Sequence, residues 1–188
     1  MIWLNKNFNM TRQRAVFLDR DGVLNFDSGY LANTNKLKIL PKVIEGLQKI
    51  KKLGFKSIII SNQSGVARKY FDLKTMWAID DNLKKHINKR EILLDDSFYC
   101  PHHPDFDKNC NCRKPKIGLI KKALKKYRLD TSKSFFIGDN MEDVLCGKNV
   151  GCKTILVPKN LNKHVQAKPD FIAKDLIEAA CWIESNQI

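Results

Sequence analysis

The chain has 188 residues, of which 43% are hydrophobic and 29% charged, a composition typical of folded globular proteins and unlike that of disordered ones. No apolar run approaches the roughly 20 residues of a membrane helix, and the polar N-terminal stretch lacks the apolar segment of a secretory signal. The length suits one full core, so we expect a single domain over residues 1–188 of a cytoplasmic monomer without membrane contact. Residues 1–13 are expected to form a flexible N-terminal extension.

The net charge is +14 and the sequence pI is about 9.6, values that raise the question of a polyanionic partner. The basic residues are spread over several helical stretches, and no recognisable nucleic-acid-binding motif accompanies them. We therefore interpret the charge as a solvated surface plus a phosphate-binding pocket, and we do not expect a nucleic acid partner. The lysines in these stretches are Lys49, Lys51, Lys52, Lys84, Lys85, Lys121, Lys122, Lys125 and Lys126.

Short apolar runs alternate with stretches that carry apolar residues at helical spacing, which predicts alternating strands and helices. The predicted strands cover residues 15–19, 57–61, 97–100, 134–138 and 154–157. The predicted helices run from Pro41 to Gly54, from the cap Asp72 to 87, over 117–127 and 142–149, and onward from about 176. This alternation predicts an α/β, Rossmann-like fold, a mainly parallel sheet with helices on both faces. Ligands of such sheets bind beyond the C-terminal ends of the strands.

The first predicted strand ends in two acidic residues, Asp19 and Asp21, followed by Gly22. A carboxylate at this place can attack a phosphoryl group and form an aspartyl-phosphate. A second acid can protonate the leaving oxygen and later activate water. Gly22 permits the tight turn that brings both carboxylates to one pocket. Taken alone, such a pair is more often a turn with solvated acids.

Polar residues also follow the second and third predicted strands. Ser61 and Asn62 can donate hydrogen bonds to phosphate oxygens, and Arg113 and Lys114 can neutralise phosphate charge in a transition state. Alone, these residues would be interpreted as a polar loop and a surface basic pair.

The fourth predicted strand is followed by Asp139, Glu142 and Asp143. These acids can hold Mg²⁺, which prefers a few carboxylates together with water and substrate phosphate. The alternative is a helix N-terminus capped by Asp139, with Glu142 completing an arrangement like a capping box. Each motif is weak or moderate alone, but four of them at the ends of successive strands together indicate an active site.

Three cysteines and two histidines lie within thirteen residues, at 100, 102, 103, 110 and 112. Three thiolates and one imidazole supply the ligands of a closed tetrahedral zinc site, and soft thiolates do not suit Mg²⁺. Because such a site has no open position, we expect a structural zinc ion on Cys100, His102, Cys110 and Cys112. His103 is the alternative imidazole ligand.

The zinc loop, residues 100–114, runs directly into Arg113 and Lys114. Zinc would therefore fix a long loop and place the phosphate-binding cations, and its loss should loosen the site before the sheet unfolds. The remaining cysteines, Cys146, Cys152 and Cys181, have apolar neighbours and are expected to be inert, reduced core thiols.

The order of these motifs resembles that of the haloacid dehalogenase superfamily of phosphatases. The motifs are Asp19-Arg-Asp21-Gly-Val, Ser61, Lys114, and Gly138-Asp139 with Asp143. The resemblance implies a magnesium-dependent phosphatase, a phosphoric monoester hydrolase, with Asp19 as nucleophile and Asp21 as general acid and base. It implies Mg²⁺ on the Asp19 carboxylate, the Asp21 carbonyl and Asp139, phosphate binding by Ser61, and transition-state stabilisation by Lys114. Asp143 would support the metal site without ligating the metal.

A narrower resemblance covers residues 15–183. Its motifs are Cys-Pro-His-His-Pro at 100–104, Cys-Asn-Cys-Arg-Lys-Pro at 110–115, Ser61-Asn-Gln-Ser-Gly-Val-Ala-Arg68, and Tyr70-Phe71. They are similar to those of the D-glycero-D-manno-heptose-1,7-bisphosphate phosphatases, and the histidinol-phosphate phosphatases share most of them. The resemblance implies a bacterial enzyme of heptose activation for lipopolysaccharide biosynthesis, without a large cap domain. It also implies Asn62, Arg68 and Arg113 as substrate contacts.

The chain departs from this family at three places. Asn140 stands where lysine is usual, Lys69 stands where glycine is frequent, and the stretch between His102 and Cys110 is shorter than is common. These changes leave the predicted chemistry intact and bear on the substrate rim.

Three other functions remain as alternatives. Histidinol-phosphate phosphatase shares the catalytic core, and a polynucleotide 3′-phosphatase would explain the +14 charge. A non-catalytic, zinc-bearing interaction domain is the third, and the intact set of Asp19, Asp21, Lys114 and Asp139 argues against it.

Overall fold

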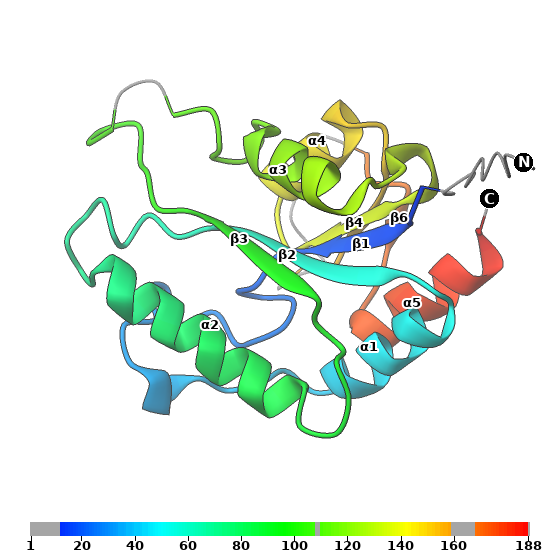
Figure 1. Ribbon diagram of the computed structural model, residues 1–188, viewed down its shortest axis with the longest axis horizontal. Helices are drawn as coiled ribbons and strands as arrows, with labels where there is room; N and C mark the ends of the chain where they lie inside the picture. The colour runs from blue at the N-terminus through cyan, green and yellow to red at the C-terminus, as the bar shows by residue number, and fades with distance from the viewer. Residues whose placement is uncertain (1–11, 108–109, 159–167, 188) are drawn as a thin grey trace, which may run out of the picture.

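The computed structural model describes residues 12–107, 110–158 and 168–187, and the strands in these ranges form one sheet in the order β3-β2-β1-β4-β5-β6 (Figure 1). All five pairings are parallel, so the predicted α/β class is confirmed. The strands are β1 (Ala15–Leu18), β2 (Lys56–Asn62), β3 (Asp96–Cys100), β4 (Phe135–Gly138), β5 (Lys153–Leu156) and β6 (Phe171–Ile172). The helices are α1 (Val43–Lys52), α2 (Leu73–Ile87), α3 (Gly118–Tyr127), α4 (Met141–Asn149) and α5 (Leu176–Ser185), with short 3-10 turns η1 (Thr34–Lys36) and η2 (Thr131–Lys133).

Helices cover both faces of the sheet, and each face has its own core (Figure 1). Alternate side chains of one strand enter opposite cores, as Val16 and Phe17 of β1 do. The helices α1, α2 and α5 contribute to the Val16 core, and α3 and α4 contribute to the Phe17 core. Because both faces are covered, the central strands β1 and β4 are continuous apolar runs.

The parallel register brings the C-terminal ends of the central strands to one edge. Leu18 of β1 pairs with Ile59 of β2 and with Ile137 of β4, so the residues that follow these positions lie side by side. The segments after β2 and after β3 leave the sheet at this same end (Figure 1). The described residues contain no cap domain over this edge, as the family resemblance implies.

The start of one helix and the presence of one strand differ from the prediction, and other strand bounds shift by at most a single residue. Helix α1 begins at Val43 and not at Pro41, because Lys42 adopts a left-handed conformation with φ 64° and cannot continue a helix backwards to the proline. Gly54, with φ 80°, follows the end of α1 as expected. Strand β6 was not predicted, since two residues are too few to show a strand pattern.

Two further expectations need correction. Cys181 is exposed on α5 and is not a core thiol, whereas Cys146 and Cys152 are buried. Gln13 exchanges backbone hydrogen bonds with Arg128 and Asp130, so the expected flexible extension does not reach it. Residues 1–11 lie outside the described residues. In the part of the chain that the structure describes, no helix is both long and apolar enough to cross a bilayer.

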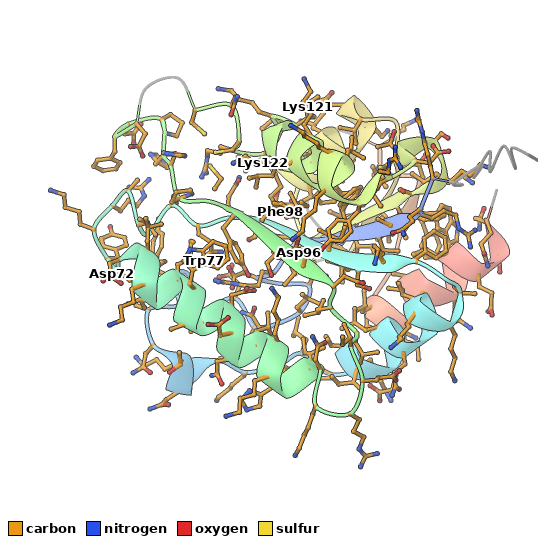
Figure 2. All side chains as sticks on the ribbon, in the orientation of Figure 1. Asp72, Trp77, Asp96, Phe98, Lys121 and Lys122 are labelled. Atoms are coloured by element: carbon orange, nitrogen blue, oxygen red, sulfur yellow. The ribbon has the colours of Figure 1, made fainter. Side chains whose placement is uncertain are left out.

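The lysines of α3 form a solvated face. Lys121 and Lys122 extend from this helix at the surface (Figure 2), and both are exposed. Lys126 pairs at 2.8 Å with Asp96 of the edge strand β3. This arrangement supports the interpretation of the net charge as surface solvation.

Helices α1 and α5 pack closely at Gly46, which predicts a local sensitivity to substitution. A Cβ atom at Gly46 would lie 2.9 Å from the carbonyl carbon and oxygen of Leu176, main-chain atoms that cannot turn away as a side chain would. We expect Gly46→Ala to lower the free energy of unfolding by about 1–3 kcal/mol, the usual cost of overpacking. Chemical denaturation measures this, with the exposed Glu45→Ala on the same helix as control. Equal stability of both variants would contradict this packing.

Candidate active site

Four strand ends deliver the candidate side chains to one edge of the sheet. Asp19 follows β1, Ser61 lies at the end of β2, Cys100 ends β3, and Asp139 follows β4. The backbone N–H of Asp19 donates to the carbonyl of Ile137 at 2.9 Å, which holds the end of β1 beside that of β4. The predicted placement of these polar motifs beyond the C-terminal strand ends matches the topology.

Lys114 is buried at this edge between two carboxylates. Its Nζ lies 2.7 Å from Asp19 Oδ1 and 2.6 Å from Asp143 Oδ1, and the lysine side chain is only 2% exposed. Burial by itself would lower the pKa of Lys114, but the charges of Asp143 and Asp19 outweigh it and raise the pKa above its ordinary value. Lys114 is therefore a permanent cation inside the site.

Three carboxylates gather around this lysine. One oxygen each of Asp19, Asp139 and Asp143 lies within 4.8 Å of the others. Burial, together with the negative charges of Asp19 and Asp139, raises the pKa of Asp143 to about 7, against the opposing charge of Lys114. One lysine does not neutralise three acids, so the donor set fits a hard divalent cation such as Mg²⁺, which takes oxygen ligands.

Glycine is required where these acids approach the main chain. A Cβ atom at Gly22, which has φ +83°, would overlap the carboxylate of Asp139. A Cβ atom at Gly138 would overlap Asp143 in the same way. Gly22 therefore leaves room for the Asp139 carboxylate, and Gly138 leaves room for the Asp143 side chain.

Asp21 points into a separate group of hydrogen-bond donors. Its Oδ2 accepts from Arg20 Nη2 and Gln63 Nε2, both at 2.8 Å, and its Oδ1 accepts from Asn25 Nδ2 at 2.8 Å. Burial alone would raise the pKa of Asp21, but Arg20, Asn25 and Gln63 lower it below its ordinary value. Sequence reasoning missed all three of these donors, because a buried arginine beside an aspartate has no periodic signal.

The α4 helix is capped by Asn140 and not by Asp139. Asn140 Oδ1 accepts from the N–H of Glu142 at 2.9 Å, and Asp143 Oδ2 accepts from the N–H of Asn140 at 3.3 Å, which completes a capping box. The anticipated role of Glu142 in the box is thus taken by Asp143. Residue 140 therefore has a structural task at the place where the family usually carries lysine.

The side-chain amide of Asn62 forms hydrogen bonds with the main chain of Lys114. Its Oδ1 accepts from the N–H of Lys114 at 3.0 Å, and its Nδ2 donates to the carbonyl of Lys114 and to Glu142 Oε2, both at 3.2 Å. Both amide hydrogens and the amide oxygen are thus engaged with protein atoms. A substrate oxygen that approached the Asn62 amide would have to replace Glu142.

The cysteines of the zinc loop converge with His102. The Sγ atoms of Cys100, Cys110 and Cys112 lie 3.0–3.5 Å apart, and His102 Nδ1 lies 3.3 Å from Cys112 Sγ and 3.7 Å from Cys100 Sγ. Zinc–sulfur bonds of about 2.3 Å in a tetrahedron place sulfurs roughly 3.8 Å apart, so the group needs to expand by less than about 1 Å to hold zinc. The cysteines are free thiols.

The thiol of Cys110 has a lowered pKa, which favours its deprotonated form. Burial by itself would raise the pKa of Cys110, but hydrogen bonds from the Cys112 thiol and from the N–H groups of Cys112 and Arg113 lower it to about 6. Deprotonated sulfur is the form that binds metal. This ligand set fits the soft, tetrahedral site of zinc.

The two arginines expected to contact the substrate interact with the histidines of the zinc loop, and Ser61 interacts with Gln63. Arg68 Nη2 lies 2.8 Å from His103 Nε2, so His103 points toward Arg68, whereas His102 joins the thiols. Arg113 Nη1 donates to the carbonyl of His102 at 3.4 Å. Ser61 Oγ accepts from Gln63 Nε2 at 3.2 Å.

The raised pKa of Asp143 predicts a pH-dependent stability. A carboxyl whose pKa rises on folding stabilises the folded state while it is protonated, and that stability is lost as the pH rises from 3.8 through about 7. In magnesium-free buffer, we expect the unfolding free energy of Asp143→Asn to lack this decrease with rising pH. Added Mg²⁺ should make the decrease smaller in the wild type, because a bound cation favours the carboxylate form of Asp143.

Unfolding by urea at a series of pH values measures this difference. The exposed Asp81→Asn on α2 is the control and should keep the wild-type slope. Identical slopes in Asp143→Asn and wild type would contradict the assignment.

Comparisons with known proteins agree with this geometry. A family model described as HAD-hydrolase-like matches residues 111–179. The chain is 38% identical over 150 residues to a D-glycero-beta-D-manno-heptose-1,7-bisphosphate 7-phosphatase of Pasteurella multocida, covering 77% of this chain and 82% of that protein. It is also 38% identical over 143 residues to a D-glycero-alpha-D-manno-heptose-1,7-bisphosphate 7-phosphatase of Photorhabdus laumondii, covering 73% and 78%.

A solved structure shares the fold over almost the whole chain. It is a D,D-heptose 1,7-bisphosphate phosphatase from B. bronchiseptica complexed with magnesium and phosphate, with a TM-score of 0.82 and 28% identity. The match covers 92% of this chain and 99% of that one. The order of the acidic and basic motifs, the parallel sheet and these relatives agree, and the chain belongs to the heptose-1,7-bisphosphate 7-phosphatase family of HAD-like hydrolases.

Proposed function

We propose that this protein is a Mg²⁺-dependent phosphatase that removes the C7 phosphate of D-glycero-D-manno-heptose 1,7-bisphosphate, giving heptose 1-phosphate and phosphate. The observation that carries the chemistry is the buried Lys114 ammonium between Asp19 and Asp143, with Asp139 beside them. The substrate follows from the relatives named above, among which both anomers of the heptose occur.

In the first step, a carboxylate oxygen of Asp19 forms a bond to phosphorus while the bond from phosphorus to the sugar oxygen breaks. Asp21 is ionised in the free protein because its pKa is lowered, so it takes up a proton from the phosphate monoanion of the substrate and then gives that proton to the leaving oxygen. Lys114 is held against Asp19 and stabilises the negative charge that spreads over the phosphoryl oxygens.

In the second step, water attacks the phosphorus of the aspartyl-phosphate. Asp21, now a carboxylate, accepts a proton from the water, and the bond from Asp19 to phosphorus breaks. Inorganic phosphate leaves, and both aspartates return to their starting states.

Magnesium would be held by the Asp19 and Asp139 carboxylates and the Asp21 carbonyl, with Asp143 in support. It would neutralise phosphate charge and reduce the repulsion between the Asp19 carboxylate and the substrate. The carboxylates clustered within 4.8 Å support this assignment.

Ser61 is proposed to bind phosphate, and Arg68 and Arg113 to contact the substrate at the rim. Asn62 reaches the substrate only if it leaves Glu142, and its contacts with the Lys114 main chain support a role in holding that lysine. The two arginines are anchored on the zinc loop, which would therefore shape the substrate rim.

A structural zinc ion is proposed on Cys100, His102, Cys110 and Cys112. Only Arg113 separates Cys112 from Lys114, so the metal would fix the loop that carries the catalytic cation. A cytoplasmic location is proposed with it, because thiols stay reduced there and remain able to bind metal.

The proposed function predicts Mg²⁺-dependent phosphate release with a preference for heptose bisphosphate. Both heptose anomers, histidinol phosphate and a 3′-phosphorylated oligonucleotide are compared at equal concentration. We expect the highest kcat/KM with heptose bisphosphate, and a turnover below about 10⁻³ of wild type in Asp19→Asn because the nucleophile is lost.

A folded Asp19→Asn variant with substantial turnover would overturn the covalent mechanism. Preference for histidinol phosphate would keep the chemistry and reassign the substrate. Preference for the oligonucleotide, with a steep decrease of activity in salt, would indicate a polynucleotide phosphatase.

The zinc assignment predicts about one zinc ion per chain in protein purified under reducing conditions without chelators. We expect Cys112→Ser to lower zinc content and to reduce phosphate release by more than about tenfold, because Lys114 loses its support. The matched control is Cys181→Ser, at an exposed cysteine outside the zinc loop, and it should keep the wild-type zinc content and rate of phosphate release. Metal analysis that found no zinc in the wild type would remove this site.

A further inference from the structure

The side chain of Gln63 connects three groups of the site. It is buried, with 5% of the residue exposed, and its Nε2 donates to Asp21 Oδ2 at 2.8 Å and to Ser61 Oγ at 3.2 Å. Its Oε1 accepts from Arg20 Nη2 at 2.8 Å. The proposed general acid and base, the proposed phosphate-binding hydroxyl and a buried guanidinium therefore meet at one carboxamide.

The hydrogen-bonding groups of Arg20 and Asp21 require an amide at position 63. Arg20 can only donate, and an ionised Asp21 can only accept, so the group between them must offer one acceptor and one donor. A carboxylate at position 63 would face the carboxylate of Asp21, and an apolar side chain would serve neither neighbour. The neighbours also fix which end of the amide faces which partner.

The main chain of Gln63 is anchored as firmly as its side chain. Its N–H donates to the carbonyl of Cys100 at 2.7 Å, which joins the end of β2 to the first cysteine of the zinc loop. Beneath the amide, Arg20 is fully buried, and its guanidinium lies 5.7 Å from the ring centroid of Tyr99. The amide is thus a rigid support.

Asp21 needs such a support for proton transfer. Its Oδ1 is held by Asn25, and its Oδ2 is held by Gln63 and Arg20, so the carboxyl cannot rotate freely. General acid catalysis requires the proton donor within hydrogen-bond reach of the leaving oxygen. A misplacement of about 1 Å can cost roughly 10²-fold in rate.

We propose that Gln63 is a positioning residue that orients the Asp21 carboxyl for proton transfer to the leaving oxygen. The inference rests on the proposed phosphatase chemistry and adds a residue to it. In the step concerned, the electron pair of the breaking phosphorus–oxygen bond remains on the leaving oxygen, and the Asp21 proton moves to that oxygen while Asp19 bonds to phosphorus.

The nature of the leaving group separates this role from a merely structural one. A sugar hydroxyl is a poor leaving group and needs the proton, whereas the nitrophenolate of p-nitrophenyl phosphate leaves without protonation. A positioning defect at Asp21 therefore lowers kcat/KM for the sugar phosphate and spares the aryl phosphate. Damage to the phosphate pocket or the fold lowers both.

The experiment compares Gln63→Met with wild type on heptose 1,7-bisphosphate and p-nitrophenyl phosphate, using the full chain with Mg²⁺. We expect kcat/KM for the sugar phosphate to fall about tenfold, below the ~10²–10⁴-fold contribution of the whole general acid. The aryl phosphate should stay within about twofold of wild type. Asp21→Asn should show the same selectivity with a larger loss, and the half-buried Gln48→Met on α1 should change neither rate.

A second variant, Gln63→Asn, tests the same role if Gln63→Met does not fold. It keeps an amide in the buried space, but it is one methylene shorter and does not reach Asp21, so the same selective loss is expected. Equal losses on both substrates, or no loss on either, would overturn the inference, as would an Asp21→Asn variant without leaving-group selectivity.

Failure of the proposed function has a different signature. A wild type that ignores heptose bisphosphate but hydrolyses another sugar phosphate overturns the substrate assignment, and Gln63 is then measured on that sugar phosphate. A wild type that hydrolyses no phosphate monoester overturns both.

Discussion

The ammonium group of Lys114, buried between Asp19 and Asp143, holds the charges of the active-site edge in balance. Removing one partner from a buried ion pair leaves an uncompensated charge and costs several kcal/mol, roughly 3–5 in measured cases. Lys114 lies 95 residues from Asp19 in the sequence and arrives on the zinc loop, where Asn62 holds its main chain. The charge around Asp19, which follows β1, thus depends on the loop that follows β3.

The parallel sheet explains how such distant groups meet. Because β1, β2, β3 and β4 run in one direction, their C-terminal ends form one edge, and each contributes a polar residue there. Glycines at 22 and 138 let the acidic groups approach the main chain closely. The helices on both faces keep the edge fixed, because each strand is packed from two sides.

A second buried network reaches Asp21 through Arg20, which donates to its Oδ2. Arg20 lies over the ring of Tyr99, whose hydroxyl donates at 2.7 Å to Asp80, a buried residue of α2. Burial raises the pKa of Tyr99, and the neighbouring Asp80 raises it further, so its hydroxyl remains a donor. Arg20, Tyr99 and Asp80 each have a partner of complementary type, while Arg20 Nη1 is buried without a hydrogen-bond partner.

The amino-acid sequence alone determined the α/β class, the positions of the main strands and the order of the acidic and basic motifs, because short apolar runs and the polar residues that follow each of them are local signals. It did not determine the Lys42 helix start, the Asn140 cap, the exposure of Cys181, or the joining of Arg20 and Gln63 to Asp21. Those depend on which side chains meet across the sheet and at what distance. Only the tertiary structure decided that Lys114 lies between two carboxylates and that His102, rather than His103, faces the thiols, since adjacent residues point in different directions and only packing selects between them.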